Sequence, residues 1–290
     1  MEKFKLCAFA DEADKMISGQ IAALQGNSMD LIELRGIDGK NVADITADEA
    51  KELKNRLDGE GIAVWSIGSP IGKVDITSPA QDELDRFKRV LETANICGAE
   101  NIRMFSFYKT DSSSACFDEI CRRLDDMISA AKGSGVDLCH ENEKGIYGDI
   151  AERCYKLHAA LPAFKGVFDP ANFVQCGEDT LVAWELLKPY IKYAHIKDAG
   201  EDGKVVPPGA GIGHLPELLP RFYESGIKVL TLEPHLKSFV GLAALEGGDT
   251  HNVGSSFANN REAFDFAVKA LEKLMTENGY HKESNGEWIK

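Results

Sequence analysis

The 290-residue chain lacks several features that would assign it quickly to a functional class. No hydrophobic run approaches the roughly 18 residues of a membrane span, and the apolar stretch near the N-terminus is too short for a secretory signal. No C-x-x-C, P-loop or G-x-G-x-x-G motif occurs, although GAGIGH (209–214) resembles the last superficially. We therefore expect no membrane partner, no disulfide framework and no glycine-loop nucleotide site.

Positive charge is also scarce. The chain has 33 Lys and Arg against 47 Asp and Glu, a formal net charge of −14, and shows no basic patch. Proteins that bind nucleic acid usually carry such a patch, so nucleic acid is not an expected partner. The seven cysteines are odd in number and scattered, which indicates a reducing compartment and predicts a cytoplasmic location.

Short apolar runs alternate with longer amphipathic stretches along the whole chain. This alternation is typical of βα units around a parallel sheet. The expected strands are 4–9, 30–34, 62–67, 101–107, 136–141, 166–169, 192–196 and 228–233. The expected helices are 15–26, 47–59, 79–97, 115–133, 148–160, 179–188, 215–225 and 260–277.

Eight βα units without a nucleotide-type glycine loop favour an α/β fold of the (βα)8 TIM-barrel type. A single barrel commonly needs about 250 residues, and no linker-like segment divides the chain. We therefore expect one domain over 1–290, with 279–290 as a loose tail.

Local signals mark several element boundaries. Thr46 with Glu49, and Ser78 with Gln81, fit the capping box, and Pro79 suits a first helical position. Four glycines between a helix and the next strand are expected to end those helices in the left-handed conformation: Gly61, Gly98, Gly135 and Gly226.

Four of the expected strands end in residues that commonly bind metal ions. These residues are Glu141, Asp169, His195 and Glu233, spaced about one βα unit apart. In a barrel the carboxyl ends of all strands meet at one mouth, where active sites lie. Three carboxylates and one imidazole suit Mn²⁺ best, with Mg²⁺, Co²⁺ or Zn²⁺ as alternatives.

Three of these residues also have an ordinary structural explanation. Glu141 could be solvated at a loop start, Asp169 before Pro170 could be a turn or cap residue, and His195 could be a core histidine. The metal hypothesis depends on the joint placement of all four residues at successive strand ends.

Other polar residues near strand ends are candidates for substrate binding. They are Glu33, Arg35, Arg103, Asn172, Lys197 and His235. For Arg35 and Arg103, an ion pair with Glu33 or another carboxylate is an equally good interpretation.

The later motifs resemble the xylose isomerase-like TIM barrels, the sugar phosphate isomerase/epimerase family. The resemblance runs from FADE (9–12) and IELRGIDGKNV (32–42) through HENEKGIYG (140–148) to FDPAN (168–172), HIKDA (195–199) and LEPH (232–235). It implies that Glu141, Asp169, His195 and Glu233 hold one divalent metal. It also implies that Glu141 and Glu233 act as acid and base, as in the ketose 3-epimerase branch.

The chain differs from that branch at two places. Asn172 stands where the branch commonly has His, and Lys197 with Asp198 where it has Arg.

The expected function is a metal-dependent isomerase or epimerase of a sugar or sugar phosphate that works through an enediolate. The alternatives are a dehydratase of an inositol- or sugar-like ketone, an endonuclease of the same superfamily, and a sugar-binding barrel without catalysis. A homodimer is the expected assembly.

Overall fold

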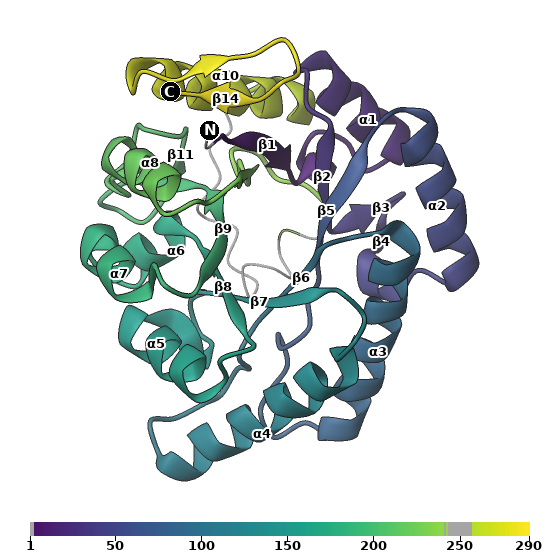
Figure 1. Ribbon diagram of the computed structural model, residues 1–290, viewed down its shortest axis with the longest axis vertical. Helices are drawn as coiled ribbons and strands as arrows, with labels where there is room; N and C mark the ends of the chain where they lie inside the picture. Colours follow the sequence, from purple (N-terminus) through teal and green to yellow (C-terminus); the bar gives the residue numbers. More distant parts are fainter. Residues whose placement is uncertain (1–2, 241, 243–256) are drawn as a thin grey trace.

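Eight parallel strands form a closed barrel, as predicted, in a computed structural model that describes residues 3–240, 242 and 257–290. The order around the barrel is β1-β12-β9-β8-β7-β6-β5-β2, so each strand pairs with its neighbours in the chain and β1 closes on β12 (Figure 1). The strands are β1 Lys5–Ala8, β2 Leu31–Leu34, β5 Ala63–Gly68, β6 Asn101–Met104, β7 Asp137–Glu141, β8 Lys165–Phe168, β9 Ile191–Ile196 and β12 Val229–Leu232.

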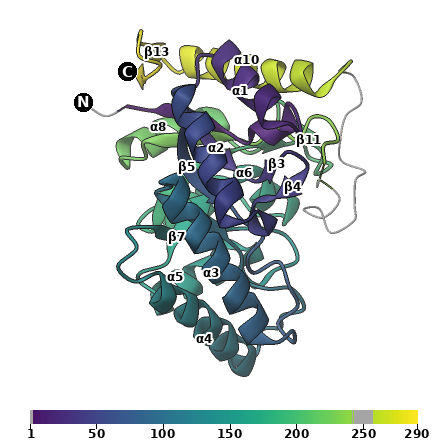
Figure 2. The same ribbon diagram turned by 90° about the vertical axis from the view of Figure 1, so that its right-hand side faces the viewer.

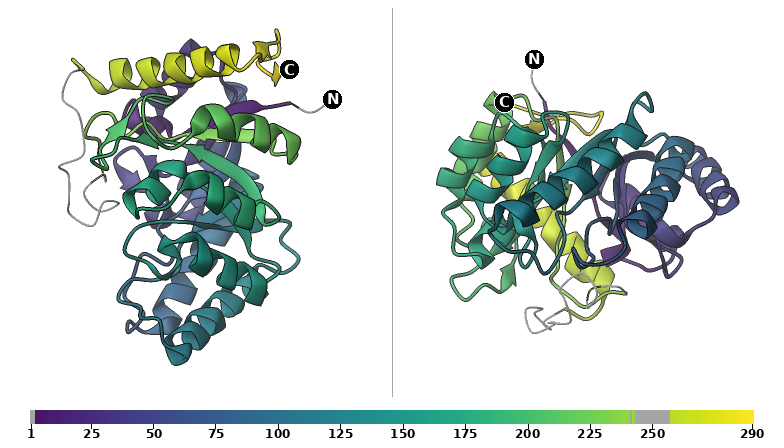
Figure 3. Two further views of the ribbon diagram at one scale, coloured as in Figure 1. Left: turned by 90° about the vertical axis from the view of Figure 1, so that its left-hand side faces the viewer. Right: turned by 90° about the horizontal axis from the view of Figure 1, so that it is seen from below.

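Helices surround the barrel. Figure 2 shows α1 to α4 on one side, and Figure 3 shows α5, α7 and α8 on the opposite side. The helices are α1 Ile17–Gly26, α2 Ala47–Gly59, α3 Ala80–Cys97, α4 Ser114–Ala131, α5 Ala151–Ala160, α6 Pro170–Gln175, α7 Thr180–Leu187, α8 Leu215–Glu224 and α10 Asn260–Glu277. All eight expected helices are confirmed, with ends that differ by a few residues. None of the helices within the described ranges is long and apolar enough to cross a membrane.

Most boundary signals are confirmed, but two at the start of α3 are wrong: the Ser78–Gln81 capping box and the place of Pro79 at the first helical position. Thr46 and Glu49 form the capping box of α2, and the four helix-ending glycines have positive φ. The expected box of Ser78 and Gln81 does not form, because α3 begins only at Ala80. Pro79 keeps an extended ψ of 122° outside the helix, and Gln81 donates to Asp85 instead.

Short elements escaped the sequence analysis because two to six residues are too few to show a periodicity. They are helix α6, the 3-10 turns η1 Ala10–Glu12, η2 Val42–Asp44 and η3 Tyr147–Asp149, and the ribbons β3 Gly36–Ile37 with β4 Lys40–Asn41 and β10 Asp198–Ala199 with β11 Val205–Val206.

The glycine-rich segment 209–213 packs around a carboxylate of the chain itself. Backbone N–H groups of Gly209, Gly211 and Gly213 donate to the Asp198 carboxylate at 3.0 Å each. A Cβ on Gly211 would lie 2.3 Å from the carbonyl oxygen of Ala199, so this close approach requires glycine. The glycines of this segment, which make it resemble a nucleotide-binding loop, therefore serve to bind the Asp198 carboxylate.

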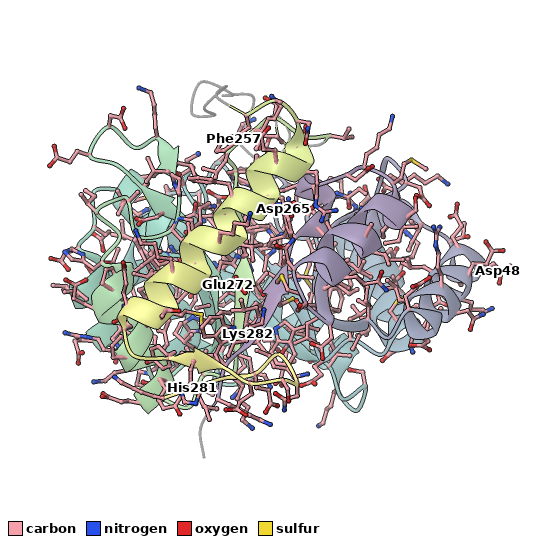
Figure 4. The ribbon with its side chains drawn as sticks, turned by 90° about the horizontal axis from the view of Figure 1, so that it is seen from above. Asp48, Phe257, Asp265, Glu272, His281 and Lys282 are labelled. Carbon is pink, nitrogen blue, oxygen red and sulfur yellow. The ribbon has the colours of Figure 1, made fainter. Side chains whose placement is uncertain are left out.

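The expected loose tail is wrong. Residues 279–290 contain an antiparallel ribbon of β13 His281–Lys282 and β14 Trp288–Ile289. Trp288 is buried and exchanges two backbone hydrogen bonds with Phe4, and Lys282 pairs with Glu272 of α10 at 2.8 Å (Figure 4). The burial of apolar surface by Trp288 offsets the conformational entropy that this segment loses when it is ordered.

The barrel interior is apolar at its floor and polar at its mouth. The floor is a separate cluster of buried residues: Cys7, Trp65, Cys139, Val167, Tyr193 and Val229. Side chains alternate along a strand, so Cys139 and Glu141 both point inward, as do Tyr193 and His195. The next inward-facing residue above the floor is therefore polar on both strands.

Two buried histidines lie between the barrel and α5. His140 Nε2 is 3.0 Å from Ser106 Oγ, and His158 Nδ1 is 2.9 Å from the carbonyl oxygen of Phe164. His158 also stacks on Tyr190. Burial lowers the pKa of His140 to about 3 and the pKa of His158 to about 4.

This pair predicts a loss of stability in acid. Below pH 6.5 the unfolded chain protonates both imidazoles while the folded protein does not, so the free energy of unfolding falls as pH drops from 6.5 toward 4. Each histidine contributes roughly 1.4 kcal/mol per pH unit on the steep part of this range. Urea unfolding at several pH values should show a shallower pH dependence for His158→Phe. The exposed control His281→Gln should keep the wild-type slope, and equal slopes in both variants would contradict the assignment.

Candidate metal centre

The four residues expected to bind a metal meet at the mouth of the barrel. Glu141 ends β7, Asp169 follows β8, His195 lies on β9 and Glu233 follows β12. One ligand atom of each lies within 4.8 Å of the others, and all four side chains are buried. Their convergence follows from barrel closure, because each residue stands at the carboxyl end of its strand.

Glu141 is held by an imidazole and a guanidinium. Its Oε1 lies 2.9 Å from His195 Nδ1, and its Oε2 lies 3.1 Å from Arg103 Nη1. Burial favours the neutral acid, but His195 and Arg103 outweigh it and lower the pKa of Glu141 to about 2. Arg103, a predicted substrate contact, is thus ion-paired with a carboxylate.

Glu233 is shared between two cations. Arg35 Nη1 lies 2.8 Å from its Oε1, and Lys197 Nζ lies 3.0 Å from its Oε2. Burial acts to raise the pKa of Glu233, but Lys197 and His235 hold it well below its usual value. The carboxylate is therefore ionised, and its orientation is fixed from both sides.

Arg35 is fully engaged with carboxylates. Besides Glu233, it donates to Asp11 through Nε and Nη2 and to Glu12 through Nη2, at 2.9 to 3.0 Å. Its guanidinium lies between the rings of Phe9 and Phe239, 4.3 and 4.5 Å from their centroids. Its first role in this structure is to hold Glu233. A contact with substrate remains a prediction.

Asp169 combines a local and a long-range role. Its Oδ1 caps α6 by accepting the Asn172 N–H at 2.9 Å. Its Oδ2 accepts no hydrogen bond of good geometry, although Lys197 Nζ lies 3.1 Å away. Burial raises the pKa of Asp169 to about 7 despite Lys197. The cap explanation is thus confirmed, and the metal-binding role of Asp169 stays a prediction.

His195 connects the metal centre to the barrel interior. Its Nε2 lies 3.3 Å from Glu33, which also accepts from Tyr193 at 2.8 Å. Burial opposes a charge on the ring, but Glu141 and Glu33 raise the pKa of His195 to about 10. Glu33 therefore orients His195 from below.

Asn172 joins the ends of β7 and β8. Its side-chain amide donates to the Asn142 carbonyl at 2.9 Å and approaches Glu141 Oε1 at 3.4 Å. Asn142 and Asp169 in turn exchange two 2.9 Å hydrogen bonds. These bonds fix the relative positions of Glu141 and Asp169.

The donor set fits one divalent cation. Carboxylate oxygens bind such ions at about 2.0–2.2 Å, so ligands on opposite sides of an ion lie roughly 4.2 Å apart. The mutual distances within 4.8 Å meet this requirement with small adjustments. The Asp169 oxygen without a hydrogen bond is the kind of atom that a cation would satisfy.

A second group of potential ligands overlaps the first. Glu12, Glu233 and His235 also lie close enough to share an ion. Here the positive charge already comes from Arg35, which pairs with both glutamates. Burial opposes charge on His235, but Glu12 and Glu233 raise its pKa to about 9.

Sequence reasoning assigned no role to Asp11 or Glu12. Both are buried in η1, directly after β1, and both bind Arg35. Their position at the carboxyl end of the first strand is the same signal that identified the other ligands. Ser66, which donates to Glu33 at 3.1 Å, has a similar position on β5.

The fold and this site define a (βα)8 barrel with a buried carboxylate–histidine centre at its mouth. A family model described as xylose isomerase-like TIM barrel matches residues 21–275. The chain belongs to that family. Among proteins with curated descriptions, none has a significantly matching sequence.

Solved structures share the fold at low identity. A D-psicose 3-epimerase with D-tagatose from Clostridium cellulolyticum H10 has a TM-score of 0.74 and 15% identity, covering 94% of this chain and 99% of that one. The probable 3-DHS dehydratase AsbF from Bacillus anthracis has a TM-score of 0.71 and 16% identity, and the match covers 94% of this chain and 98% of that one. The IolI protein with a bound zinc atom has a TM-score of 0.71 and 17% identity, and the match covers 95% of this chain and 99% of that one.

The role of Arg35 predicts a large loss of stability on its removal. Arg35→Met leaves Asp11, Glu12 and Glu233 buried without their shared cation, and breaking a buried ion pair costs about 3–5 kcal/mol. Urea unfolding near pH 7 should measure this loss. Arg89→Met, an exposed arginine on α3, is the control and should change stability by less than about 1 kcal/mol. Equal losses would refute the proposed role.

Proposed function

We propose that the protein is a divalent-metal-dependent isomerase or epimerase of a small sugar or sugar phosphate, acting through an enediolate. One observation carries this proposal: two glutamates, an aspartate and a histidine from four strands converge on one buried point. The family membership supports it.

Glu141, Asp169, His195 and Glu233 would hold the metal ion, with Mn²⁺ as the favoured ion. When bound, such an ion supplies a Lewis acid that polarises a substrate carbonyl and acidifies the adjacent C–H. Glu33 would keep the His195 ring in place through its contact with Nε2.

The two glutamates would carry the proton transfers. One carboxylate removes the proton from the carbon beside the carbonyl, and the other, after taking up a proton from a substrate hydroxyl or from solvent, delivers it to the opposite face or to the neighbouring carbon. General acid–base catalysis of this kind contributes roughly 10²- to 10⁴-fold. Arg35, Lys197 and Arg103 fix the orientation of these carboxylates, and Lys197 and His235 would also contact substrate oxygens.

The products distinguish the isomerase from the dehydratase, which uses the same enediolate. A dehydratase expels a β-hydroxyl as water, whereas an isomerase or epimerase keeps the molecular formula. Mass spectrometry of products from a panel of ketoses, aldoses and their phosphates with Mn²⁺ would decide between them.

Metal binding provides the first test. Calorimetric titration of metal-free protein with Mn²⁺ should show one ion per chain, and Asp169→Asn should weaken its binding at least tenfold. Asp179→Asn is the matched control, because Asp179 also caps a helix, α7, but is exposed. Absence of binding in the wild type, or equal weakening in both variants, would refute the metal centre.

The glutamate roles provide the second test. Glu141→Gln and Glu233→Gln should each lower turnover, and proton exchange between substrate and D₂O, by at least about 10²-fold. Circular dichroism should show a retained fold, and the exposed control Glu152→Gln should keep full activity. Near-wild-type exchange in either site variant would remove that residue from the mechanism.

A further inference from the structure

A cavity of about 390 Å³ lies beside the candidate metal centre. It opens between the ends of β2 and β5, the β3–β4 ribbon, α3 and the segment after β12, and we call it the β2 cavity. Sites for small molecules commonly measure about 300–1,000 Å³. Its size therefore suits one end of a small substrate.

The charge of the β2 cavity is opposite to that of the whole chain. Its charged lining residues are the cations Lys15, Arg35, Lys40, Lys73 and Arg86 and the acids Asp11 and Asp44. In a chain with a net charge of −14, this is a local reversal of sign. Such a reversal favours an anionic ligand.

Three of these cations already have close carboxylate partners. Arg35 is paired as described above, Lys40 contacts Glu49 at 2.5 Å, and Lys73 contacts Glu143 at 2.9 Å. These three therefore supply little unbalanced charge.

The other two cations supply the unbalanced charge. Arg86 approaches Asp44 only to 3.8 Å, and Lys15 has no ion pair with any described residue. Arg86 is half-buried on α3, and Lys15 is exposed before α1. A guanidinium that makes no close ion pair in a cavity wall can bind an anion through two parallel hydrogen bonds.

Arg35 links the β2 cavity to the metal centre. It lines the cavity and also donates to Glu233 at 2.8 Å. Phe239 covers its guanidinium and, with Pro70, gives the cavity an apolar wall. The metal centre and the cavity are therefore neighbours that share Arg35 as a wall.

We propose that the β2 cavity binds an anionic group of the substrate, a phosphate monoester or a carboxylate, through Arg86 and Lys15. This inference rests on the proposed function, because the anionic group belongs to the molecule whose carbonyl reaches the metal centre. A neutral sugar would bring no negative charge to either cation. The substrate class is thus narrowed to acidic sugars or sugar phosphates.

Direct binding of small anions tests the proposal without turnover. Calorimetry should detect binding of inorganic phosphate or of acetate to the wild-type protein, and Arg86→Gln and Lys15→Gln should each weaken it at least tenfold. The controls are Arg89→Gln on the same helix and Lys51→Gln on α2, both exposed. Each control removes the same charge away from the cavity and should leave anion binding unchanged.

The two probes distinguish the two sources of negative charge. Tighter binding of phosphate indicates a phosphate monoester, and tighter binding of acetate indicates a carboxylate. Failure of both probes to bind the wild type, or equal weakening by Arg86→Gln and Arg89→Gln, would overturn the proposal. If the wild-type protein does not bind Mn²⁺, the proposed function is refuted instead. The two experiments therefore test the cavity and the metal centre separately.

Discussion

The mouth of this barrel depends on the compensation of buried negative charge. Carboxylates at the ends of β7, β8 and β12 are removed from water, which is costly unless each meets a cation. The chain supplies Arg35, Arg103 and Lys197 at distances of 2.8 to 3.1 Å. Because Glu233 contacts both Arg35 and Lys197, it connects the first barrel strands to the last ones electrostatically.

The positive side chains near the mouth fall into two groups, which differ in whether a carboxylate lies close to them. The cations at the centre are each paired with a buried carboxylate, whereas Arg86 and Lys15 in the neighbouring cavity lack close partners. Burial explains the difference, since a buried cation requires a partner and a more exposed one can remain solvated until a ligand arrives. In the proposed function, Arg86 and Lys15 would bind the anionic group of the substrate, whereas Arg35 and Arg103 orient carboxylates at the centre.

The sequence predicted the barrel, its eight strands and the four converging donors, because strand ends in a closed parallel barrel share one rim. It could not predict which carboxylate each arginine would choose: Arg35 pairs with Asp11, Glu12 and Glu233 rather than with Glu33. Such pairings depend on the register across strands that are distant in sequence. The ribbon in 279–290 was missed for the same reason, since the partner of Trp288 lies near the other end of the chain.

Barrel closure by the first and last strands has a consequence for biosynthesis. Lys5 pairs with Val229, so β1 leaves the ribosome long before β12 exists. At translation rates of about 5–20 residues per second, the wait is on the order of ten seconds or more. During that time the backbone N–H and C=O groups of β1 on the β12 side have no strand partner. The nascent chain therefore offers a binding segment to chaperones throughout most of its synthesis.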